Sequence, residues 1–234
     1  MRFPKILLAT PTSKYKDYCS DLFIKQVQSI NYPVDVLIVD NSADYTYHNK
    51  FNQEGINVIH ENPNGRSARE YMVACNEIIR NYAITDNYDY IFSLESDIFV
   101  DSDIIYKLLS HNKQVVGVSY FLFEFEKTVP MLLQHLSNET QLSISLPKIE
   151  SSFLKYTGKL ERVSGLGLGC VLIHRSVFSK IPFRVDMSRS GHADSFFYED
   201  LILNNIPCYV DTSIMATHKN SDWGAVMDNQ INQK

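Results

Sequence analysis

The sequence predicts a mostly parallel, doubly wound α/β sheet with helices on both faces. Short continuous apolar runs alternate with segments whose apolar residues recur at helical spacing, and proline, acids or amides stop the first runs. Continuous apolar runs of this length are typical of strands covered on both faces, as in a parallel sheet. In such a sheet the ligand site lies at the carboxyl ends of the strands, where the stopping residues fall.

Composition favours a single domain, residues 1–234, that does not bind nucleic acid. Of the 234 residues 44% are hydrophobic, which is enough for a substantial core. Lys plus Arg number 22 against 27 Asp plus Glu, the net charge is −5, and no block of basic residues is present. A small anionic ligand needs only a local basic cluster, which net charge does not exclude.

The four cysteines indicate a reducing compartment. Cys19, Cys75, Cys170 and Cys208 lie far apart and lack the paired spacing of a zinc site or a disulfide framework. No apolar run approaches the length that spans a bilayer, and the N-terminus lacks the layout of a signal peptide. We therefore expect a cytoplasmic protein without a membrane span.

The first elements form a βαβ unit. Apolar runs predict strands at 5–9, stopped by Pro11, and at 34–39, stopped by Asp40. Apolar residues at helical spacing predict a helix over 18–30 between them. The alternation continues with a strand, a turn and a helix, then a further strand and helix, at 56–60, 62–65, 67–82, 90–94 and 103–109.

The second half of the chain is harder to interpret. We expect strands over 115–123 and 162–174, a helix over 194–205 and a short strand over 208–210 before His218. The segment 124–161 has no sustained period, and a hairpin or a helical excursion is expected there. The tail beyond Trp223 is polar.

Two acids stand at the end of the strand predicted over 90–94. If the strand persists, Glu95 and Asp97 point the same way, because alternate side chains share a face of a sheet, and both can reach one cation. Hard oxygen ligands suit magnesium, manganese or calcium. The alternative is a solvated strand end whose acids cap the next helix.

Other residues are candidates for binding a nucleotide. Asp40 at a strand's carboxyl end can accept from a hydroxyl or imide donor, or it can cap a turn with Asn41 and Ser42. Arg66 and Arg69 begin a helix, where cations oppose the macrodipole, so an anion such as a diphosphate is expected in front of them. Alternatively both arginines are solvated, with Arg66 bridging Glu70.

Glycines in the 162–174 segment and acids near the start of the 194–205 helix are further candidates for a functional site. Gly165, Gly167 and Gly169 alternate in a strand-like segment, where glycine indicates close approach of a ligand or backbone, or tight packing. Asp194, Glu199 and Asp200 lie near one helix start, where an acid can be an N-cap. An acid that caps a helix can also act as a general base.

Six segments together resemble GT-A fold glycosyltransferases, and family-two-like members most. They are the acidic "DxD-like" triplet 95–97 and, in the order that this family shows, the stretches "LLATPTSKY", "VLIVDNSAD", "NPNGRSAREYMVACN", "SGLGLGCVLIHRSVF" and "HADSFFYEDLILNNIPCYVDTSIMATH". Two residues depart from the pattern: Glu95 stands where the family carries Asp, and Asn41 where many members carry a second Asp.

The resemblance implies a metal-dependent enzyme that moves a sugar from a nucleoside-diphosphate sugar to a hydroxyl of a carbohydrate or glycoconjugate acceptor, with inversion. It implies a nucleotide-binding half over 1–110, an acceptor-binding half over 111–218 and a tail over 219–234. Imidazole beside carboxylates favours Mn²⁺ over Mg²⁺ as the cofactor. The implied metal ligands are Glu95, Asp97 and His218.

The resemblance also assigns the remaining roles. The general base is Asp194, with Asp200 ranked second; it takes the proton of the attacking acceptor hydroxyl. The residues implied to bind the nucleotide sugar are Pro11, Thr12, Asp40, Asn41, Arg66, Arg69, Glu95, Ser96 and Gly167. Trp223 either stacks on a sugar or anchors the tail.

Two other functions stay open at the level of the sequence. A nucleotidyltransferase shares the sheet and the metal-bound nucleotide, but it usually carries a glycine-rich, basic loop after the first strand, and "ATPTSKYKDY" contains no glycine. A non-catalytic nucleotide-sugar binding module would keep the metal site without needing Asp194. Replacing Asp194 by Asn separates an enzyme from such a module.

Overall fold

The computed structural model describes residues 3–62, 64–124, 127–133 and 158–219. Its main strands are β1 (Ile6–Thr12), β2 (Val34–Asp40), β3 (Asn57–His60), β4 (Tyr90–Leu94), β6 (Val115–Ser119), β10 (Leu160–Val163), β12 (Cys170–His174) and β13 (Cys208–Met215). Short strands complete the set: β5 (Ile98–Phe99), β7 (Phe121–Glu124), β8 (Lys127–Pro130), β9 (Leu132–Leu133), β11 (Gly165–Leu166) and β14 (Thr217–His218). The helices are η1 (Lys14–Lys16), α1 (Asp17–Ser29), α2 (Thr46–Gln53), α3 (Ala68–Thr85), α4 (Ile104–Ser110), α5 (Arg175–Phe178) and α6 (Ala193–Leu203).

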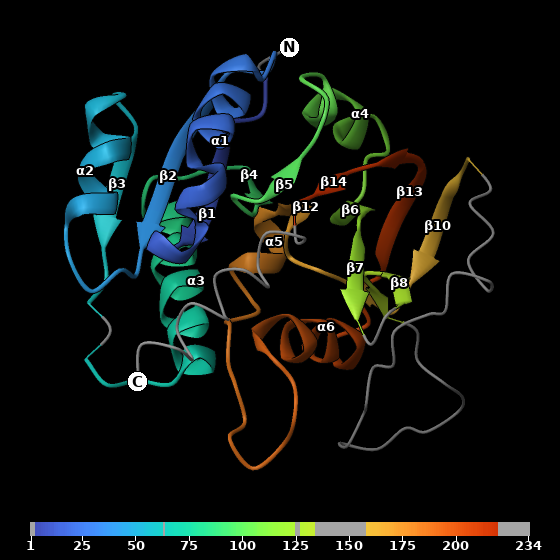
Figure 1. Ribbon diagram of the computed structural model, residues 1–234. Coiled ribbons are helices and arrows are strands. Elements are labelled where there is room, and N and C mark those ends of the chain that lie inside the picture. The colour runs from blue at the N-terminus through green and yellow to red at the C-terminus, as the bar shows by residue number, and fades with distance from the viewer. Residues whose placement is uncertain (1–2, 63, 125–126, 134–157, 220–234) are drawn as a thin grey trace.

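One eight-stranded sheet, in the order β10-β13-β6-β12-β4-β1-β2-β3, organises the molecule. Strand β12 is antiparallel to both neighbours and β10 is antiparallel to β13, whereas the other adjacent pairs are parallel. Figure 1 shows β3 and α2 at one edge and β10 at the other. The predicted class, a mostly parallel sheet of the α/β type, is confirmed.

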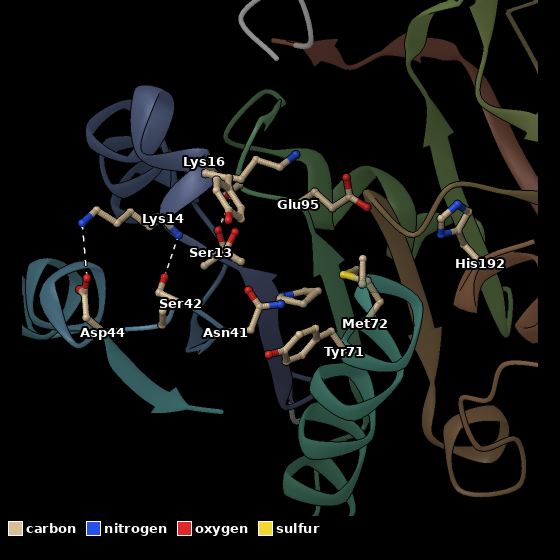
Figure 2. A pocket seen from close by; sticks show the side chains of 16 residues that line it. Ser13, Lys14, Lys16, Asn41, Ser42, Asp44, Tyr71, Met72, Glu95 and His192 are labelled. Carbon is tan, nitrogen blue, oxygen red and sulfur yellow. Dashed lines mark hydrogen bonds and ion pairs between the residues drawn. The ribbon is translucent and has the colours of Figure 1, made fainter. Parts of the chain in front are cut away.

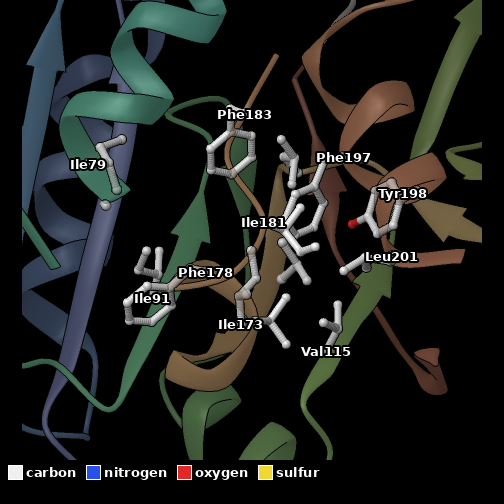
Figure 3. Close-up of a cluster of buried hydrophobic side chains, with 14 of the residues drawn as sticks. Ile79, Ile91, Val115, Ile173, Phe178, Ile181, Phe183, Phe197, Tyr198 and Leu201 are labelled. Carbon is white, nitrogen blue, oxygen red and sulfur yellow. The ribbon is translucent and has the colours of Figure 1, made fainter. Parts of the chain in front are cut away.

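Helices cover both faces of this sheet because its strands are apolar on both sides. In β1, Leu7 and Ala9 join one buried cluster, whereas Ile6 and Leu8 join another. The first cluster includes side chains of α3, α5 and α6 (Figure 3), and the second those of α1, α2 and α4. This alternation is the doubly wound arrangement that the continuous apolar runs predicted.

The prediction of one strand over 162–174 is wrong. The segment divides into β10, β11 and β12, and its glycines lie against aromatic rings. A Cβ atom at Gly165 would lie 2.6 Å from Cγ of Tyr198, and one at Gly167 would lie 2.0 Å from the hydroxyl of Tyr120. These approaches admit no side chain, so tight packing accounts for both glycines.

Other boundaries also differ from the sequence-based expectations. The 115–123 segment breaks at Tyr120 into β6 and β7, and the last strand is longer than 208–210 because it runs to Met215. Helices α2 and α5 were not expected. Strands β7 and β8 form the hairpin expected within 124–161, and residues 134–157 and the tail with Trp223 lie outside the described residues. Within the described ranges, no helix has the length and apolar character needed to cross a membrane.

Candidate functional site

The carboxyl ends of β1, β2 and β4 meet at one edge of the sheet. These strands are adjacent and parallel, and Thr12 is in register with Asp40. The hydroxyl of Thr12 lies 2.9 Å from that of Ser96, just past the end of β4. The amide of Asn41 donates to the carbonyl of Thr12 at 2.9 Å. Residues from three distant segments are therefore held together where a ligand site is expected.

A cavity of about 610 Å³ opens at this edge (Figure 2). Its walls are residues 11–16 at and after the end of β1, residues 41–44 after β2, residues 95–96 after β4, three residues of α3 and His192. The predicted residues Pro11, Thr12, Asn41, Glu95 and Ser96 are among them. A volume of this size matches pockets that hold small organic ligands.

Asp40 is buried directly before Asn41, which lines the cavity, and one of its oxygens has no partner among the described residues. Its Oδ1 accepts from the amide and the hydroxyl of Ser42, so the turn-capping interpretation holds for that oxygen. Its Oδ2 has no hydrogen-bond partner among the described residues. Burial raises the pKa of Asp40, and the bonds from Ser42 oppose this shift. The second oxygen is therefore a buried acceptor for which a ligand donor is the natural partner.

The two predicted arginines are engaged by the protein itself. Arg66 pairs with Glu61 at 2.6 Å, and not with Glu70, which forms a capping box with Ser67 at the start of α3. Arg69 donates to the carbonyl oxygens of Asp186 and Arg189, at 2.8 Å each. Neither arginine lines the cavity; Tyr71 and Met72 of the same helix do.

The acids after β4 occupy different environments. The strand ends at Leu94, and a turn follows it. The amide of Ile98 closes this turn by donating to the carbonyl oxygen of Glu95 at 3.0 Å. The premise that the strand persists through Asp97 is therefore wrong. Glu95 lines the cavity, and burial raises the pKa of its carboxyl, against the opposing charges of Lys16 and His218.

Asp97 is fully buried among positive and polar partners. Its Oδ2 receives the Lys16 ammonium, and it lies 3.2 Å from Nε2 of His218 and 3.4 Å from the hydroxyl of Tyr18. Burial by itself raises the pKa of Asp97, but His218 and Lys16 outweigh that effect and hold it below its usual range. Oδ1 has no hydrogen-bond partner in the described part of the chain.

Asp97 and His218 have the chemistry and spacing of two metal ligands. Nδ1 of His218 lies 3.1 Å from the carbonyl oxygen of Phe121, which leaves Nε2 facing Asp97. Neighbouring ligand atoms on a magnesium-type octahedral ion lie about 2.9 Å apart, from bond lengths of about 2.0–2.1 Å. Nevertheless, no group of three or more His, Cys, Asp and Glu residues within the described ranges is arranged to hold a metal ion. The predicted set of Glu95, Asp97 and His218 is thus represented by a pair, with Glu95 nearby in the cavity wall.

Only one of the three acids on α6 is without an ion pair to a described residue. Asp200 receives a bidentate bond from Arg184 at 2.7 and 2.8 Å, and Glu199 is paired with Arg189 at 2.6 Å. Asp194 accepts from the amide of Ser195 at 2.7 Å, and burial raises its pKa. It is not the N-cap, which is His192, so the capping alternative does not account for it.

Sequence reasoning missed several residues of the site. Lys16, His192 and Tyr71 line the cavity, and the buried Tyr120 has its ring 5.2 Å from that of His218. Two lysines within five residues of a strand's carboxyl end were a usable signal for Lys16. No local signal marks Tyr120 or His192, because only the fold brings them to this edge.

Comparison with known proteins identifies the fold. No family model and no curated protein matches the chain. Among solved structures, the chain is similar to GalNAc-T7 with UDP, GalNAc and Mn²⁺ (TM-score 0.65, 10% identity) and to the mannosyltransferase PcManGT of Pyrobaculum calidifontis with GDP-Man and Mn²⁺ (0.58, 9%). It is also similar to residues 1–349 of S. aureus TarS with UDP-GlcNAc (0.53, 15%).

These neighbours are GT-A-type glycosyltransferases, and the chain has their α/β fold. The similarity covers 92–93% of this chain in each case. It covers only 44% of the GalNAc-T7 chain, 57% of the PcManGT chain and 59% of the TarS chain. The chain therefore corresponds to part of each of these proteins.

Proposed function

We propose that this protein is a divalent-cation-dependent glycosyltransferase that moves a sugar from a uridine or guanosine diphosphate sugar to an acceptor hydroxyl, with inversion. The observation that carries the proposal is the cavity at the carboxyl ends of β1, β2 and β4, on a fold shared with enzymes crystallised with such nucleotides. The cavity is lined by Asn41, Lys16 and Glu95, and the residue before Asn41, Asp40, keeps a buried acceptor oxygen without a partner among the described residues.

The nucleoside would lie against residues 11–12, 40–41 and α3. Oδ2 of Asp40 would accept from the base or the ribose, and Asn41 and Tyr71 offer further polar contacts in the cavity wall. The diphosphate would lie toward Glu95 and Ser96. Asp97 and His218 would hold the cation, Mn²⁺ or Mg²⁺, with Glu95 beside them; when bound, it would neutralise negative charge on the departing nucleoside diphosphate.

Asp194 would act as the general base. It stands at the start of α6 next to His192, which lines the cavity, and no described residue neutralises its carboxylate by an ion pair. A buried carboxyl with a raised pKa is a stronger base than a solvated one, which suits abstraction of a hydroxyl proton. Asp200 is less suited to that role because Arg184 holds both of its oxygens.

The test is a thermal-shift panel of UDP- and GDP-sugars, each with and without Mn²⁺, followed by assay of nucleoside diphosphate release with the sugars that bind. A ligand that prefers the folded state raises the melting temperature, by an amount set by its concentration over its Kd. We expect a shift with one nucleotide class that Mn²⁺ enlarges.

The result also separates the alternatives. A sugar-dependent shift without release of nucleoside diphosphate in the presence of candidate acceptors would favour a binding module. A shift with a nucleoside triphosphate and not with nucleotide sugars would favour a nucleotidyltransferase. Absence of any nucleotide-dependent shift contradicts the proposal.

A further inference from the structure

The Lys16 side chain contacts the same oxygen of Asp97 that faces His218. Lys16 ends η1 directly after β1, and its ammonium reaches across the edge of the sheet to Oδ2 of Asp97. This is the oxygen that lies 3.2 Å from Nε2 of His218. The ammonium thus stands at the pair of atoms that have the spacing of metal ligands.

The contact is buried at one end and borders the cavity at the other. The Asp97 side chain is 0% exposed, whereas the Lys16 side chain is 17% exposed and forms part of the cavity wall. Figure 2 shows Lys16 extending from the β1–α1 connection toward the side of the cavity on which Glu95 lies. A flexible four-carbon side chain can turn from Asp97 to a ligand in this cavity without movement of the backbone.

Electrostatics makes simultaneous occupancy unfavourable. An ammonium and a divalent cation at one carboxylate repel each other strongly in a site screened little by solvent. Without either cation, Asp97 would be a buried charge whose side-chain partners among the described residues are Tyr18 and His218, which is costly. If either the ammonium or the divalent cation is present, but not both, the two cations do not repel each other and the buried charge of Asp97 is neutralised.

We propose that the Lys16 ammonium and a divalent cation compete for the carboxylate of Asp97, and that Lys16, once released, binds the diphosphate of the nucleotide in the adjoining cavity. The inference rests on the proposed function in taking a divalent cation and a nucleoside diphosphate as the ligands. Lys16 is then a tethered cation that stabilises the empty site and contributes to donor binding in the occupied one. Metal and nucleotide binding are thereby coupled through one side chain.

Mn²⁺ titration of the intact chain, followed by water-proton relaxation, tests the competition without any activity measurement. Lys16→Met is expected to bind Mn²⁺ about tenfold more tightly than the wild type in the absence of nucleotide, because the competing charge is gone. Lys14→Met is the matched control, because Lys14 lines the same cavity but its ammonium lies 3.5 Å from Asp44. Its Mn²⁺ affinity is expected to stay within about twofold of the wild type.

The second half of the proposal is measured with UDP and GDP by calorimetry at saturating Mn²⁺. Lys16→Met is expected to raise the Kd of the nucleotide that binds by about tenfold, because one charged contact to a phosphate is lost. Lys16→Gln replaces Lys16→Met if the latter does not fold, since its amide can still donate to Asp97. In the wild type, acetylation of Lys16 relative to Lys14, read by mass spectrometry, is expected to increase when Mn²⁺ is added.

The outcomes distinguish this inference from the proposed function. Equal Mn²⁺ affinity in the wild type and the Lys16 variants, or Mn²⁺-independent acetylation of Lys16, overturns the competition even if a nucleotide sugar binds. Tighter Mn²⁺ binding by the variants in a protein that binds neither UDP nor GDP supports the competition and overturns the proposed function. Unchanged nucleotide affinity in the variants overturns the role assigned to released Lys16.

Discussion

The acids that follow β4 and the acids on α6 look alike in sequence but are neutralised in different ways. On α6, Glu199 and Asp200 are paired with arginines only 10 and 16 residues away, in the segment that precedes the helix. After β4, Asp97 is paired with Lys16 and His218, which are 81 and 121 residues away. Local pairs connect one segment to its neighbour, whereas the distant pairs join three parts of the chain at Asp97.

In each region one acid has no ion pair to a described residue. Glu95 lines the cavity wall, and Asp194 lies at the helix start beside His192. Burial raises the pKa of both carboxyls. A strongly perturbed acid in a cavity is a candidate for function, whereas the paired acids stabilise the surroundings.

The largest effect is expected from Asp194→Asn. Removal of a general base should lower the transfer rate by about 10²–10⁴-fold, with nucleotide binding retained. Because the folded-state pKa of Asp194 is raised, its contribution to stability is fully present below the ordinary pKa of 3.8 and is lost as the pH rises through the raised pKa. At neutral pH the variant should therefore melt no lower than the wild type in calorimetry.

Asp200→Asn is the matched comparison on the same helix. It should melt lower, by about 1 kcal/mol of unfolding free energy, because Arg184 loses its bidentate partner. Its transfer rate per folded molecule should remain within about tenfold of the wild type. Equal rates for Asp194→Asn and the wild type would remove Asp194 from the mechanism, and a larger loss in Asp200→Asn would exchange the two roles.

A smaller effect, on stability alone, is expected from Arg189→Met. Glu199 is buried and would lose both bonds from Arg189, at 2.6 and 3.0 Å, at a cost of about 2–3 kcal/mol. In a chain of this length that corresponds to a fall of about 4–12 °C in Tm. Lys107→Met, which removes an exposed pair with Asp103, should change stability by less than about 0.5 kcal/mol. Equal melting of the two variants would show that the local pairs on α6 are not stabilising.

The smallest effect is expected in the pH dependence of kcat/KM. A base must be deprotonated to act, so kcat/KM should fall as the pH drops through the pKa of Asp194. Because burial raises this pKa, the acid limb should lie above pH 3.8, the ordinary value for an aspartate. In Asp194→Asn, the residual kcat/KM should not show this fall at acidic pH. A limb at or below pH 3.8 in the wild type would contradict the burial argument.

Local patterns allowed much of this edge of the sheet to be anticipated. The apolar runs of β1, β2 and β4 and the residues that stop them predicted that Pro11, Asp40 and Glu95 would lie at one edge of the sheet, because carboxyl ends of adjacent parallel strands share one edge. The same reasoning failed where packing overrode the pattern. The 162–174 run broke because Tyr120 and Tyr198 approach its glycines, and neither ring is near in sequence.

The roles expected for the arginines show a second limit. Their position at the start of α3 suggested an anion, but Arg66 pairs with Glu61 and Arg69 binds two carbonyls of the 186–189 segment. A charge at a helix start indicates that a partner exists, and it does not identify the partner. The positive charge near the acids comes instead from Lys16, on a different element.

By itself the sequence determined the doubly wound sheet, the edge at which a ligand site would form and the acids that reach that edge. These follow from periodicity and from the residues that end each strand, which are properties of neighbouring positions. Only the tertiary structure decided which acids are neutralised and by what: Lys16 and His218 at Asp97, Arg184 at Asp200, and no described ion pair at Asp194. The partner of a buried charge depends on contacts between segments far apart in the chain, and local patterning does not encode them.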